Sequence, residues 1–380
     1  MAARYFKRIL DLKRPTSDKS CFLFGPRQTG KSSLIEHELP DAKVIDLLDD
    51  EIYLRLQQNP KDLASYVVDP TKLVVLDEIQ RIPSLLNEVH RLIEKKRMRF
   101  LLTGSSARKL RKKGVNLLGG RARSRVLHPF VFPEVRGSFD LARVLHTGNI
   151  PSILLSPDPW DDLKSYVGNY LKEEIVAEAA TRNVPAFSRF LEVAAISNGQ
   201  MINYEKISND AQVSRSTVQS YFQILRDTLI GNDLPAYRKT RTRKAIQTHK
   251  FYFFDLGVVN YLKRQKQISE NSPDFGIALE AYFHHELASY CDYHPGNELS
   301  YWRSQSGYEV DFLLNEDVAI EIKATKHANK DDFKGLLALS EDLTLRRKLL
   351  VCREATPRKM DGVEIFPIRH FLEELWDSGL

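Results

Sequence analysis

Gly25-Pro26-Arg27-Gln28-Thr29-Gly30-Lys31-Ser32 is the stretch on which the fold of this chain depends. It follows a short apolar run, residues 21–24, and precedes residues 33–36, which favour a helix. This is the G-x-x-x-x-G-K-[ST] pattern in the strand–loop–helix setting that phosphate binding requires. The glycines let the backbone point its N–H groups inward, and the following helix adds the positive end of its dipole. The stretch therefore predicts a site for the phosphates of a nucleotide.

The roles of the loop residues follow from this chemistry. Lys31 would act as a catalytic residue by reaching the β- and γ-phosphates of ATP, and the Ser32 hydroxyl would ligate Mg²⁺. We predict that ATP contacts the loop, the first turn of the helix and one side chain of a later strand. These residues are Gly25, Pro26, Arg27, Gln28, Thr29, Gly30, Lys31, Ser32, Ser33 and Thr103.

A pair of acids follows the apolar run of residues 73–76. Asp77 and Glu78 would lie at the carboxyl edge of a central strand, where ligands bind in sheets of this class. We predict that Asp77 holds Mg²⁺ through water and that Glu78 orients or deprotonates the attacking water. An acidic strand end is common by itself, but it gains weight when it follows a phosphate-binding loop.

Two further positions are candidates for contact with the γ-phosphate. Residues 99–103 predict a strand, at whose end Thr103 or Ser105 could contact the phosphate, although Ser105 or Ser106 could also cap the next helix. Arg121 follows two glycines and precedes a strand, so we predict that it stabilises transition-state charge in its own or a neighbouring subunit. The other basic residues here fit a nucleic-acid face or a solvated face equally well: Arg108, Lys109, Arg111, Lys112, Lys113 and Arg123.

The order of apolar segments predicts an α/β domain with a parallel sheet up to about residue 136. The expected strands are residues 21–25, 43–47, 73–77, 99–103 and 124–128, and the expected helices are residues 31–38, 50–58, 85–96 and 106–110. Short apolar strands that alternate with helices give a three-layer arrangement.

Length and composition set the broad class of the protein. The 380 residues suggest two or three domains, and 42% hydrophobic with 28% charged residues is ordinary for a globular protein. Three distant cysteines argue against a disulfide framework, and the chain shows neither a signal peptide nor an apolar run of bilayer length. We therefore expect a cytoplasmic protein without a membrane partner. The net charge of +6 mildly favours a polyanionic partner.

The middle of the chain predicts a helix-turn-helix unit. Residues 203–211 and 215–225 form the two expected helices, and the second shows a polar face of Arg215, Ser216, Gln219 and Gln223. The basic run of residues 238–244 precedes an aromatic strand and fits a wing between strands. DNA contact and simple packing of a subdomain both remain open for this unit.

The last part of the chain carries a second group of acids. We expect strands at residues 299–303, 309–314, 318–323 and 348–352, and a helix near residues 331–339. Adjacent strands would bring Asp311 and Glu321 together to bind Mg²⁺ or Mn²⁺, with Glu280 from a preceding helix completing the metal ligands. Lys323, on the same strand face as Glu321, would activate a water, so Asp311, Glu321 and Lys323 are predicted as catalytic. The alternative is a surface strand whose charges face solvent.

Taken together, these motifs resemble a known family over nearly the whole chain: prokaryotic AAA-type ATPases with a C-terminal domain of unknown function. The resemblance rests on residues 25–32, 76–83, 102–106, 120–121, 128–130 and 250–257, and on Glu309-Val310-Asp311-Phe312 with Glu321-Ile322-Lys323. In that family the C-terminal domain combines a winged helix with a PD-(D/E)xK nuclease-like core. One departure is Val310, which stands where the name of the nuclease motif has proline.

The resemblance implies a P-loop NTPase sheet with the loop strand at its centre, then a helical and winged-helix region, then an α/β restriction-endonuclease-like domain. We place these domains at residues 1–136, 137–256 and 257–380. The implied function is Mg²⁺-dependent ATP binding and hydrolysis coupled to DNA binding or processing, with metal-dependent nuclease activity in the C-terminal domain. The alternative is an ATP-switched regulatory protein that binds DNA or a protein and carries an inactive nuclease-like fold. A homo-oligomer or a partner protein is compatible with both.

Overall fold

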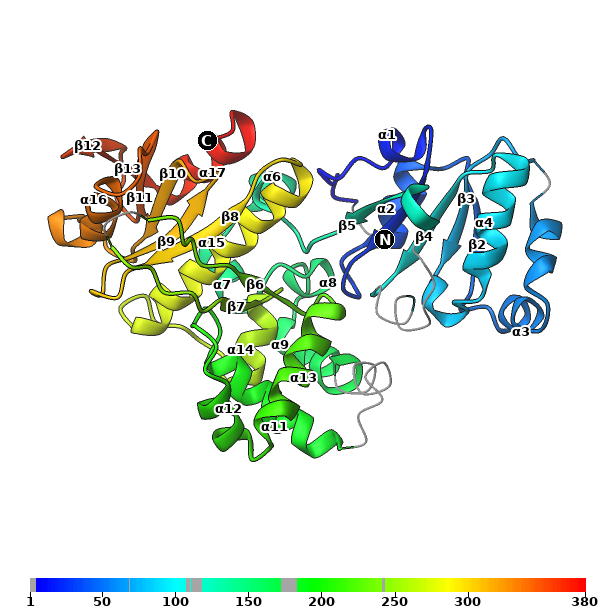
Figure 1. Ribbon diagram of the computed structural model, residues 1–380, viewed down its shortest axis with the longest axis horizontal. Helices are drawn as coiled ribbons and strands as arrows, with labels where there is room; N and C mark the ends of the chain where they lie inside the picture. The colour runs from blue at the N-terminus through cyan, green and yellow to red at the C-terminus, as the bar shows by residue number, and fades with distance from the viewer. Residues whose placement is uncertain (1–4, 68, 107–109, 111–117, 172–182, 241–242) are drawn as a thin grey trace. The chain divides into compact units, whose positions relative to one another are not determined.

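The computed structural model describes residues 5–67, 69–106, 110, 118–171, 183–240 and 243–380 (Figure 1). Contacts divide the chain into two compact units. Among the described residues, the first unit comprises residues 5–130 and Asp227–Ile230, and the second comprises residues 131–171, 183–226 and Gly231–Leu380. The second unit thus includes both the segment predicted as the middle domain and the segment predicted as the C-terminal domain.

A five-stranded parallel sheet forms the centre of the first unit. Its order is β2 (Lys43–Asp46), β3 (Val74–Asp77), β4 (Phe100–Gly104), β1 (Ser20–Phe24) and β5 (Ala122–Val126). Because every neighbouring pair is parallel, all five strands end at the same edge. The central strand is β4, not the loop strand β1 that the resemblance placed there, because the chain crosses from β1 to place β2 and β3 beyond β4.

Helices pack against this sheet through apolar faces. α4 (Leu85–Lys96) buries Leu85, Val89 and Leu92, and Asp49 caps α3 (Asp50–Gln58) by accepting from the N–H groups of Glu51 and Ile52. The remaining helical elements of this unit are α1 (Lys13–Thr16), α2 (Lys31–Glu38), η1 (Pro60–Tyr66), η2 (Ile79–Arg81) and η3 (Leu118–Gly120). Together with the α/β order, they give the predicted P-loop type of α/β fold.

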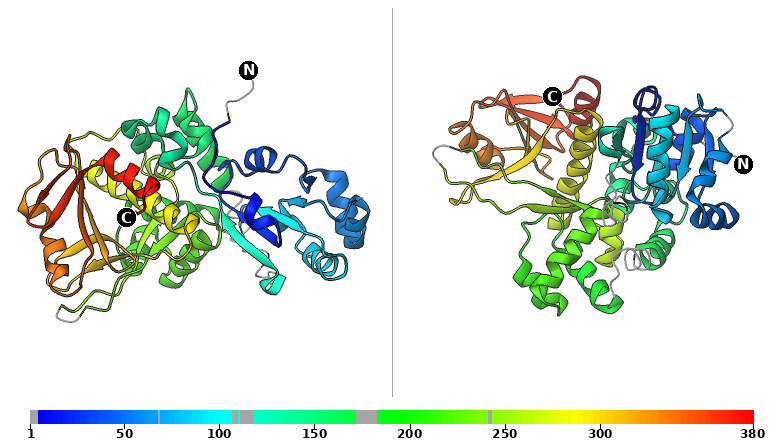
Figure 2. Two further views of the ribbon diagram at one scale, coloured as in Figure 1. Left: turned by 90° about the horizontal axis from the view of Figure 1, so that it is seen from above. Right: turned by 45° about the vertical axis from the view of Figure 1, so that its right-hand side comes forward.

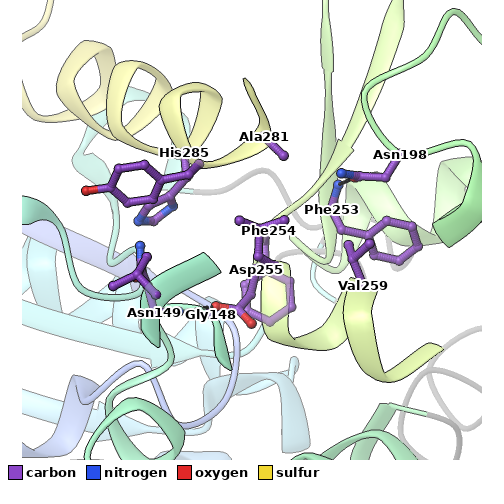
Figure 3. A pocket seen from close by; sticks show the side chains of 12 residues that line it. Gly148, Asn149, Asn198, Phe253, Phe254, Asp255, Val259, Ala281 and His285 are labelled. Atoms are coloured by element: carbon purple, nitrogen blue, oxygen red, sulfur yellow. Dashed lines mark hydrogen bonds between the residues drawn. The ribbon is translucent and has the colours of Figure 1, made fainter. Parts of the chain in front are cut away.

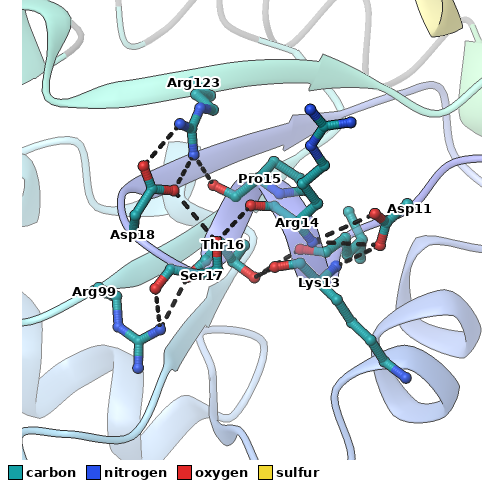
Figure 4. A network of polar contacts seen from close by, with 10 residues as sticks. Asp11, Lys13, Arg14, Pro15, Thr16, Ser17, Asp18, Arg99 and Arg123 are labelled. Carbon is teal, nitrogen blue, oxygen red and sulfur yellow. Dashed lines mark hydrogen bonds and ion pairs between the residues drawn. The ribbon is translucent and has the colours of Figure 1, made fainter.

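Two arginines fix α1 to the amino edge of the sheet (Figure 4). Arg99 Nη1 donates to the Thr16 and Ser17 carbonyls at 3.1 and 2.8 Å, and Arg123 Nη1 donates to the Pro15 carbonyl at 2.8 Å. Arg123 Nη2 also donates to Asp18 Oδ2 at 2.9 Å. Arg123 therefore pairs with groups of its own unit. Of the other basic residues predicted for this face, Arg108, Lys109, Arg111, Lys112 and Lys113 lie outside the described residues.

The second unit begins with helices and a two-stranded sheet. The helical elements are α6 (Phe132–Val135), η4 (Arg136–Ser138), α7 (Leu141–Thr147), α8 (Pro151–Leu154), α9 (Pro159–Ser165), the π-helix η5 (Tyr166–Leu171), α11 (Val184–Ile196), α12 (Tyr204–Ala211), α13 (Arg215–Asp227) and α14 (Leu256–Leu262). β6 (Gly231–Leu234) pairs antiparallel with β7 (Lys250–Phe253), and Met201 forms a single bridge with Lys250.

A buried aspartate joins these helices (Figure 3). Asp255 caps α14 by accepting from the Val258 N–H, and it also accepts from the N–H groups of Asn149 and Ile150 at 2.6 and 3.2 Å. A side chain at Gly148 would lie 2.2 Å from Asp255 Oδ1, so only glycine fits there. The adjoining cavity of about 10 Å³ has space for a single water molecule. Asp255 thus connects the start of α14 with residues 149 and 150 by hydrogen bonds, rather than being part of a ligand pocket.

A six-stranded mixed sheet forms the C-terminal part of this unit. Its order is β12 (Arg358–Met360), β13 (Val363–Pro367), β11 (Arg347–Cys352), β10 (Val318–Ile322), β9 (Glu309–Leu314) and β8 (Leu299–Arg303). The long helix α15 (Pro273–Tyr293) lies against the sheet beside α17 (Ile368–Asp377) (Figure 2). The Phe283 and Phe371 rings of these two helices lie 5.4 Å apart. The remaining helices are η6 (Lys330–Phe333) and α16 (Lys334–Ser340).

The segment between β6 and β7 covers the outer edge of β8. The Tyr237 N–H donates to the Tyr301 carbonyl at 2.7 Å, and the Ile246 N–H donates to the Arg303 carbonyl at 2.8 Å. The β8 edge, which would otherwise carry unpaired backbone groups, is therefore paired within the same unit.

Candidate functional sites

The phosphate-binding loop has the backbone that its glycines predict. β1 leads into the loop and α2 begins at Lys31, directly after Gly30 with φ of +92°. A side chain at Gly25 would lie 2.5 Å from the Leu127 carbonyl oxygen, so the neighbouring segment leaves room for glycine alone. Ser32 and Ser33 are exposed in the first turn of α2, where an anion would meet the helix N-terminus.

Lys31 lies buried inside this loop. Its Nζ donates to the carbonyl oxygens of Gly25 and Pro26 at 2.7 and 3.1 Å, while the Thr29 hydroxyl donates to the Pro26 carbonyl at 2.8 Å. Burial lowers the pKa of Lys31 to about 8, although the nearby carboxylates of Glu78 and Asp77 act in the opposite direction. The ammonium is therefore desolvated, and its direct contacts within the described part of the chain are with neutral oxygens.

Arg8, to which the sequence pattern assigns no role, supports the loop from outside. Arg8 is 6% exposed, its Nη1 donates to the Thr29 carbonyl at 2.5 Å, and its Nη2 donates to the His128 carbonyl at 2.7 Å. Its guanidinium also lies 5.0 Å from the centre of the Phe130 ring. No motif links these positions, because the His128 contact joins residues 120 positions apart.

Asp77 and Glu78 lie at the carboxyl edge, as predicted, and Thr103 connects them. The Thr103 hydroxyl donates to Asp77 Oδ1, and the Glu78 N–H donates to Thr103 Oγ1 at 3.3 Å. Thr103 is fully buried, so its hydroxyl fixes the acids at the end of β3 from the neighbouring strand β4. Ser105 contacts a different residue, Gln80.

Gln80 is the second residue that the sequence analysis did not assign. It is 5% exposed, and its Nε2 donates to Glu78 Oε2 and, at 3.2 Å, to Ser105 Oγ. A side chain at Gly104 would lie 2.3 Å from Gln80 Oε1, so this glycine makes room for the amide. Gln80 therefore sets the direction of the Glu78 carboxylate. A polar residue just after an acidic strand end was the available signal.

Arg121 lies away from this edge. It precedes β5, whose first residue Ala122 is in register with Ser20 at the start of β1, whereas the loop follows the end of β1. Its Nε pairs with Glu94. Because parallel strands share one direction, the structure corrects the prediction that Arg121 could reach the loop of its own subunit. Its action on a neighbouring subunit stays a prediction.

The carboxyl edge of the first sheet, where the phosphate-binding loop lies beside Asp77 and Glu78, is called the loop edge below. Its side chains are of the types that can hold Mg²⁺ and a triphosphate. Lys31 supplies a cation, Ser32 an exposed hydroxyl, and Asp77 a half-buried carboxylate, which are the donors that Mg²⁺-bound phosphates need. Glu78 is also half-buried and is held by an amide rather than by a cation.

The acids of the second unit lie close to one another on three elements. Glu280 is on α15, Asp311 on β9 and Glu321 on β10. Burial and the nearby Glu280 carboxylate raise the pKa of Asp311 to about 7, and burial with Asp311 raises the pKa of Glu321 well above its usual range. The Ile322 N–H donates to Asp311 Oδ2 at 2.8 Å. The sequence therefore predicted which of these acids meet.

Cations of the same unit already face these acids. Lys323 Nζ donates to Glu321 Oε1, while Lys250 Nζ lies 2.9 Å from Glu280 Oε1 and 2.8 Å from Glu309 Oε1. The Tyr252 hydroxyl donates to Glu280 Oε1 at 2.6 Å. The sequence pattern assigns no role to Lys250, Tyr252 or Glu309.

These contacts do not form the predicted metal site. Among the described residues, no group of three or more His, Cys, Asp or Glu side chains is arranged to hold a metal ion. Glu280, Asp311 and Glu321 supply suitable oxygen donors, and Glu321 Oε2 is buried without a hydrogen-bond partner in the described part of the chain. Lysines, however, take up the facing oxygens of Glu280 and Glu321.

The residues predicted to contact nucleic acid lie on two segments, α13 and the basic run of residues 238–244, whose surroundings differ. Arg215, Ser216, Gln219 and Gln223 are exposed on α13, as predicted. In the basic run, Lys239 pairs with Glu316 at 2.7 Å, and Arg243 lies 3.5 Å from Asp342 Oδ2. These two cations therefore pair with acids of their own unit, and contact of the basic run with DNA stays a prediction. Arg241 and Thr242 lie outside the described residues.

In the ranges that the structure describes, no helix combines the length and the apolar character that crossing a bilayer requires.

Comparison with protein families divides the chain into three matched segments. Residues 17–136 match the AAA domain family. Residues 138–269 match a domain of unknown function (DUF8612), and residues 275–371 match another (DUF4143). The first match and the parallel sheet identify an AAA-type P-loop ATPase domain. No curated protein matches the chain.

Several solved structures match parts of this chain at low similarity. ORC1 of Aeropyrum pernix in complex with DNA is 14% identical, with 65% of this chain and 86% of that chain covered and a TM-score of 0.26. The RuvB Holliday junction branch migration motor of Thermotoga maritima is 16% identical, with coverages of 57% and 82% and a TM-score of 0.31. A signal transduction ATPase with a tetratricopeptide repeat sensor, from Pyrococcus horikoshii, is 12% identical, with coverages of 72% and 47% and a TM-score of 0.23. TM-scores this low support no conclusion about activity.

Proposed function

We propose that this protein binds and hydrolyses ATP with Mg²⁺ and that the nucleotide state controls its binding to DNA. The observation that carries the ATPase part is the meeting of Lys31, Asp77 and Glu78 at one edge of a parallel sheet that matches an AAA domain. Hydrolysis needs a cation for the phosphates, a ligand for Mg²⁺ and a group that orients water, and these three residues supply them.

Each residue has a distinct part in this proposal. Lys31 exchanges its bonds to the Gly25 and Pro26 carbonyls for bonds to the β- and γ-phosphates. The Ser32 hydroxyl, and Asp77 through water, would hold Mg²⁺, which would neutralise phosphate charge when bound. Glu78, directed by Gln80, orients the attacking water and accepts its proton.

Substitution of Glu78 tests this proposal directly. Glu78→Gln removes the proton acceptor but keeps the size of the side chain, so ATP turnover should fall by about a hundredfold or more while ATP binding persists. Glu36→Gln, an exposed acid on α2, is the matched control and should leave turnover unchanged. Unchanged turnover in Glu78→Gln would refute the assigned role.

The DNA part of the proposal rests on the second unit. The order α11, the Met201 bridge, α12, α13, β6 and β7 supports a winged helix, with the exposed polar face of α13 as its reading surface. Binding should weaken about 10³-fold or more between 50 and 200 mM salt if at least six phosphates are contacted. Arg215→Ala should also weaken DNA binding. Arg264→Ala, which likewise removes an exposed arginine, serves as the control. A flat salt response would favour a protein partner instead.

We propose that the C-terminal part has a nuclease-like core that does not cleave DNA. The order α15, β8, β9, β10, α16 and β11 supports such a core, but Lys250 and Lys323 already pair with its acids. Purified protein with Mg²⁺ or Mn²⁺ should therefore leave DNA intact. Cleavage that disappears in both Asp311→Ala and Lys323→Ala would establish the nuclease hypothesis in its place.

A further inference from the structure

Lys250 is the centre of the carboxylate cluster in the second unit. Its side chain is 5% exposed, and its Nζ contacts a carboxylate from α15 at 2.9 Å and one from β9 at 2.8 Å. Asp311 is also near enough to favour the charged form of Lys250. One ammonium thus brings together acids from separate elements, which is the task that a divalent cation performs in a metal site.

The cluster carries nearly as many positive as negative side chains. Its carboxyl groups belong to Glu280, Glu309, Asp311 and Glu321, and its cations are Lys250, Lys323 and Arg303, whose Nη1 lies 3.0 Å from Glu309 Oε2. A divalent ion placed among these groups would add charge to a buried cluster that already has its counterions. It would also compete with Lys250 for Glu280 Oε1.

We infer that Lys250 is a built-in cation that takes the place of a divalent metal among these carboxylates, so that removing its ammonium creates a site for Mn²⁺. Lys250 contacts Glu280 and Glu309 directly and lies near Asp311, and the carboxylate oxygens of these three acids suit a hard divalent cation. Because Lys250 begins β7, the same ammonium fastens the β6–β7 sheet to α15 and β9. This inference deepens the proposed non-cleaving role of the C-terminal part and does not depend on ATP hydrolysis.

The experiment titrates Mn²⁺ alone, without nucleotide, into the full chain and follows free Mn²⁺ by electron paramagnetic resonance. An Asp77→Asn background removes the Mg²⁺ ligand of the loop edge. In that background we expect no Mn²⁺ bound by the parent chain and one Mn²⁺ bound by Lys250→Met, whose melting temperature should rise as Mn²⁺ is added. Adding Asp311→Asn to Lys250→Met should abolish this binding.

Two controls separate the metal site from general effects of the substitution. Lys239→Met also removes an ion-paired lysine of this unit, yet it should bind no Mn²⁺ because Lys239 faces Glu316 outside the cluster. Lys250→Arg keeps the positive charge and should also bind none. If Lys250→Met folds only when Mn²⁺ is present, the metal has replaced the ammonium and the inference stands.

Three results would overturn the inference. In the first, the parent chain binds Mn²⁺ and Asp311→Asn removes that binding. In the second, Lys250→Met folds but binds no Mn²⁺. In the third, Lys250→Met does not fold and Mn²⁺ does not restore its fold. In the first case, a DNA-cleavage assay shows whether the proposed non-cleaving role fails as well. ATP turnover in the chain with native Asp77 reports the ATPase proposal separately.

Discussion

Lys31 and Lys250 are both buried lysines beside carboxylates, but their ammonium groups have opposite surroundings. Lys31 donates to two backbone carbonyls, and burial lowers its pKa to about 8. Lys250 is also desolvated, but the carboxylates of Glu280, Asp311 and Glu309 outweigh burial and raise its pKa above the usual range. Similar residue types at two sheets have therefore produced two different electrostatic environments.

This difference teaches how to distinguish a binding site from a structural ion pair. A buried ammonium that contacts only neutral oxygens costs free energy that an incoming phosphate would recover. A buried ammonium between carboxylates already has its counterions, and removing it would leave buried acids unpaired. The loop edge of the first unit is thus prepared for an anion, whereas the cluster of the second unit is complete.

The largest expected effect comes from changing each lysine to methionine. Lys31→Met should weaken ATP binding by about a hundredfold or more, because the phosphates lose their buried cation, while the melting temperature stays the same or rises. Lys250→Met should lower the melting temperature and leave ATP binding unchanged. Isothermal titration with ATP and thermal melting measure the two effects, with exposed Lys43→Met as control. A lower melting temperature for Lys31→Met than for Lys250→Met would contradict the comparison.

A smaller effect is expected from Gln80→Leu. Without the amide, the Glu78 carboxylate loses the group that directs it, so kcat for ATP should fall about tenfold to a hundredfold while KM changes little. Steady-state ATPase kinetics measure this split, and Gln57→Leu on the exposed side of α3 serves as control. A rise in KM with unchanged kcat would show that Gln80 supports nucleotide binding instead.

Arg8→Lys should weaken ATP binding by about tenfold. The guanidinium joins the Thr29 and His128 carbonyls, and a lysine cannot span both with one ammonium. Titration of the variant with ATP checks this expectation, with Lys7→Ala as the exposed control. Full affinity in Arg8→Lys would mean that the loop holds its shape without this support.

The smallest effect is a pH dependence of nucleotide binding. The pKa of Lys31 is lowered to about 8 in the free protein, and phosphate charge would raise it in the complex. Binding of ATP should therefore take up protons above pH 8, and affinity should decrease as the pH rises through this range. Calorimetry in buffers of different ionisation enthalpy measures the uptake. Lys31→Met should abolish it, and uptake that persists in this variant would assign the proton to another group.

The sequence predicted most where the signals are local. The predicted helices at residues 31–38, 50–58 and 85–96 coincide with α2, α3 and α4, because a glycine loop, an aspartate cap and an apolar periodicity mark them. The strand ends likewise placed Asp77 and Glu78 at the loop edge. All these signals lie within a few residues of the elements that they define.

The sequence predicted least where a contact joins distant segments. Arg8 and Lys250 act on residues 21 to 120 positions away, and no spacing rule marks them. Gln80 directs Glu78 from two positions away, but it also donates to Ser105, which lies 25 positions along the chain. Arg121 is a different case, because a residue that precedes a parallel strand lies at the amino edge by topology alone. The acidic partners of Lys239 and Arg243 in the basic run, Glu316 and Asp342, come from a part of the chain that sequence order keeps far away, so no local signal marks these pairs.

The pairing of residues 235–237 and 244–246 with β8 has a practical consequence for dividing this protein. A fragment that begins at residue 257, the boundary predicted from the sequence, would lack both this covering segment and Lys250. It would expose the β8 edge to other chains, which is a common route to aggregation, and would leave Glu280 and Glu309 without their shared cation. A soluble C-terminal fragment should therefore begin before β6, so that the covering segment stays with the sheet that it protects.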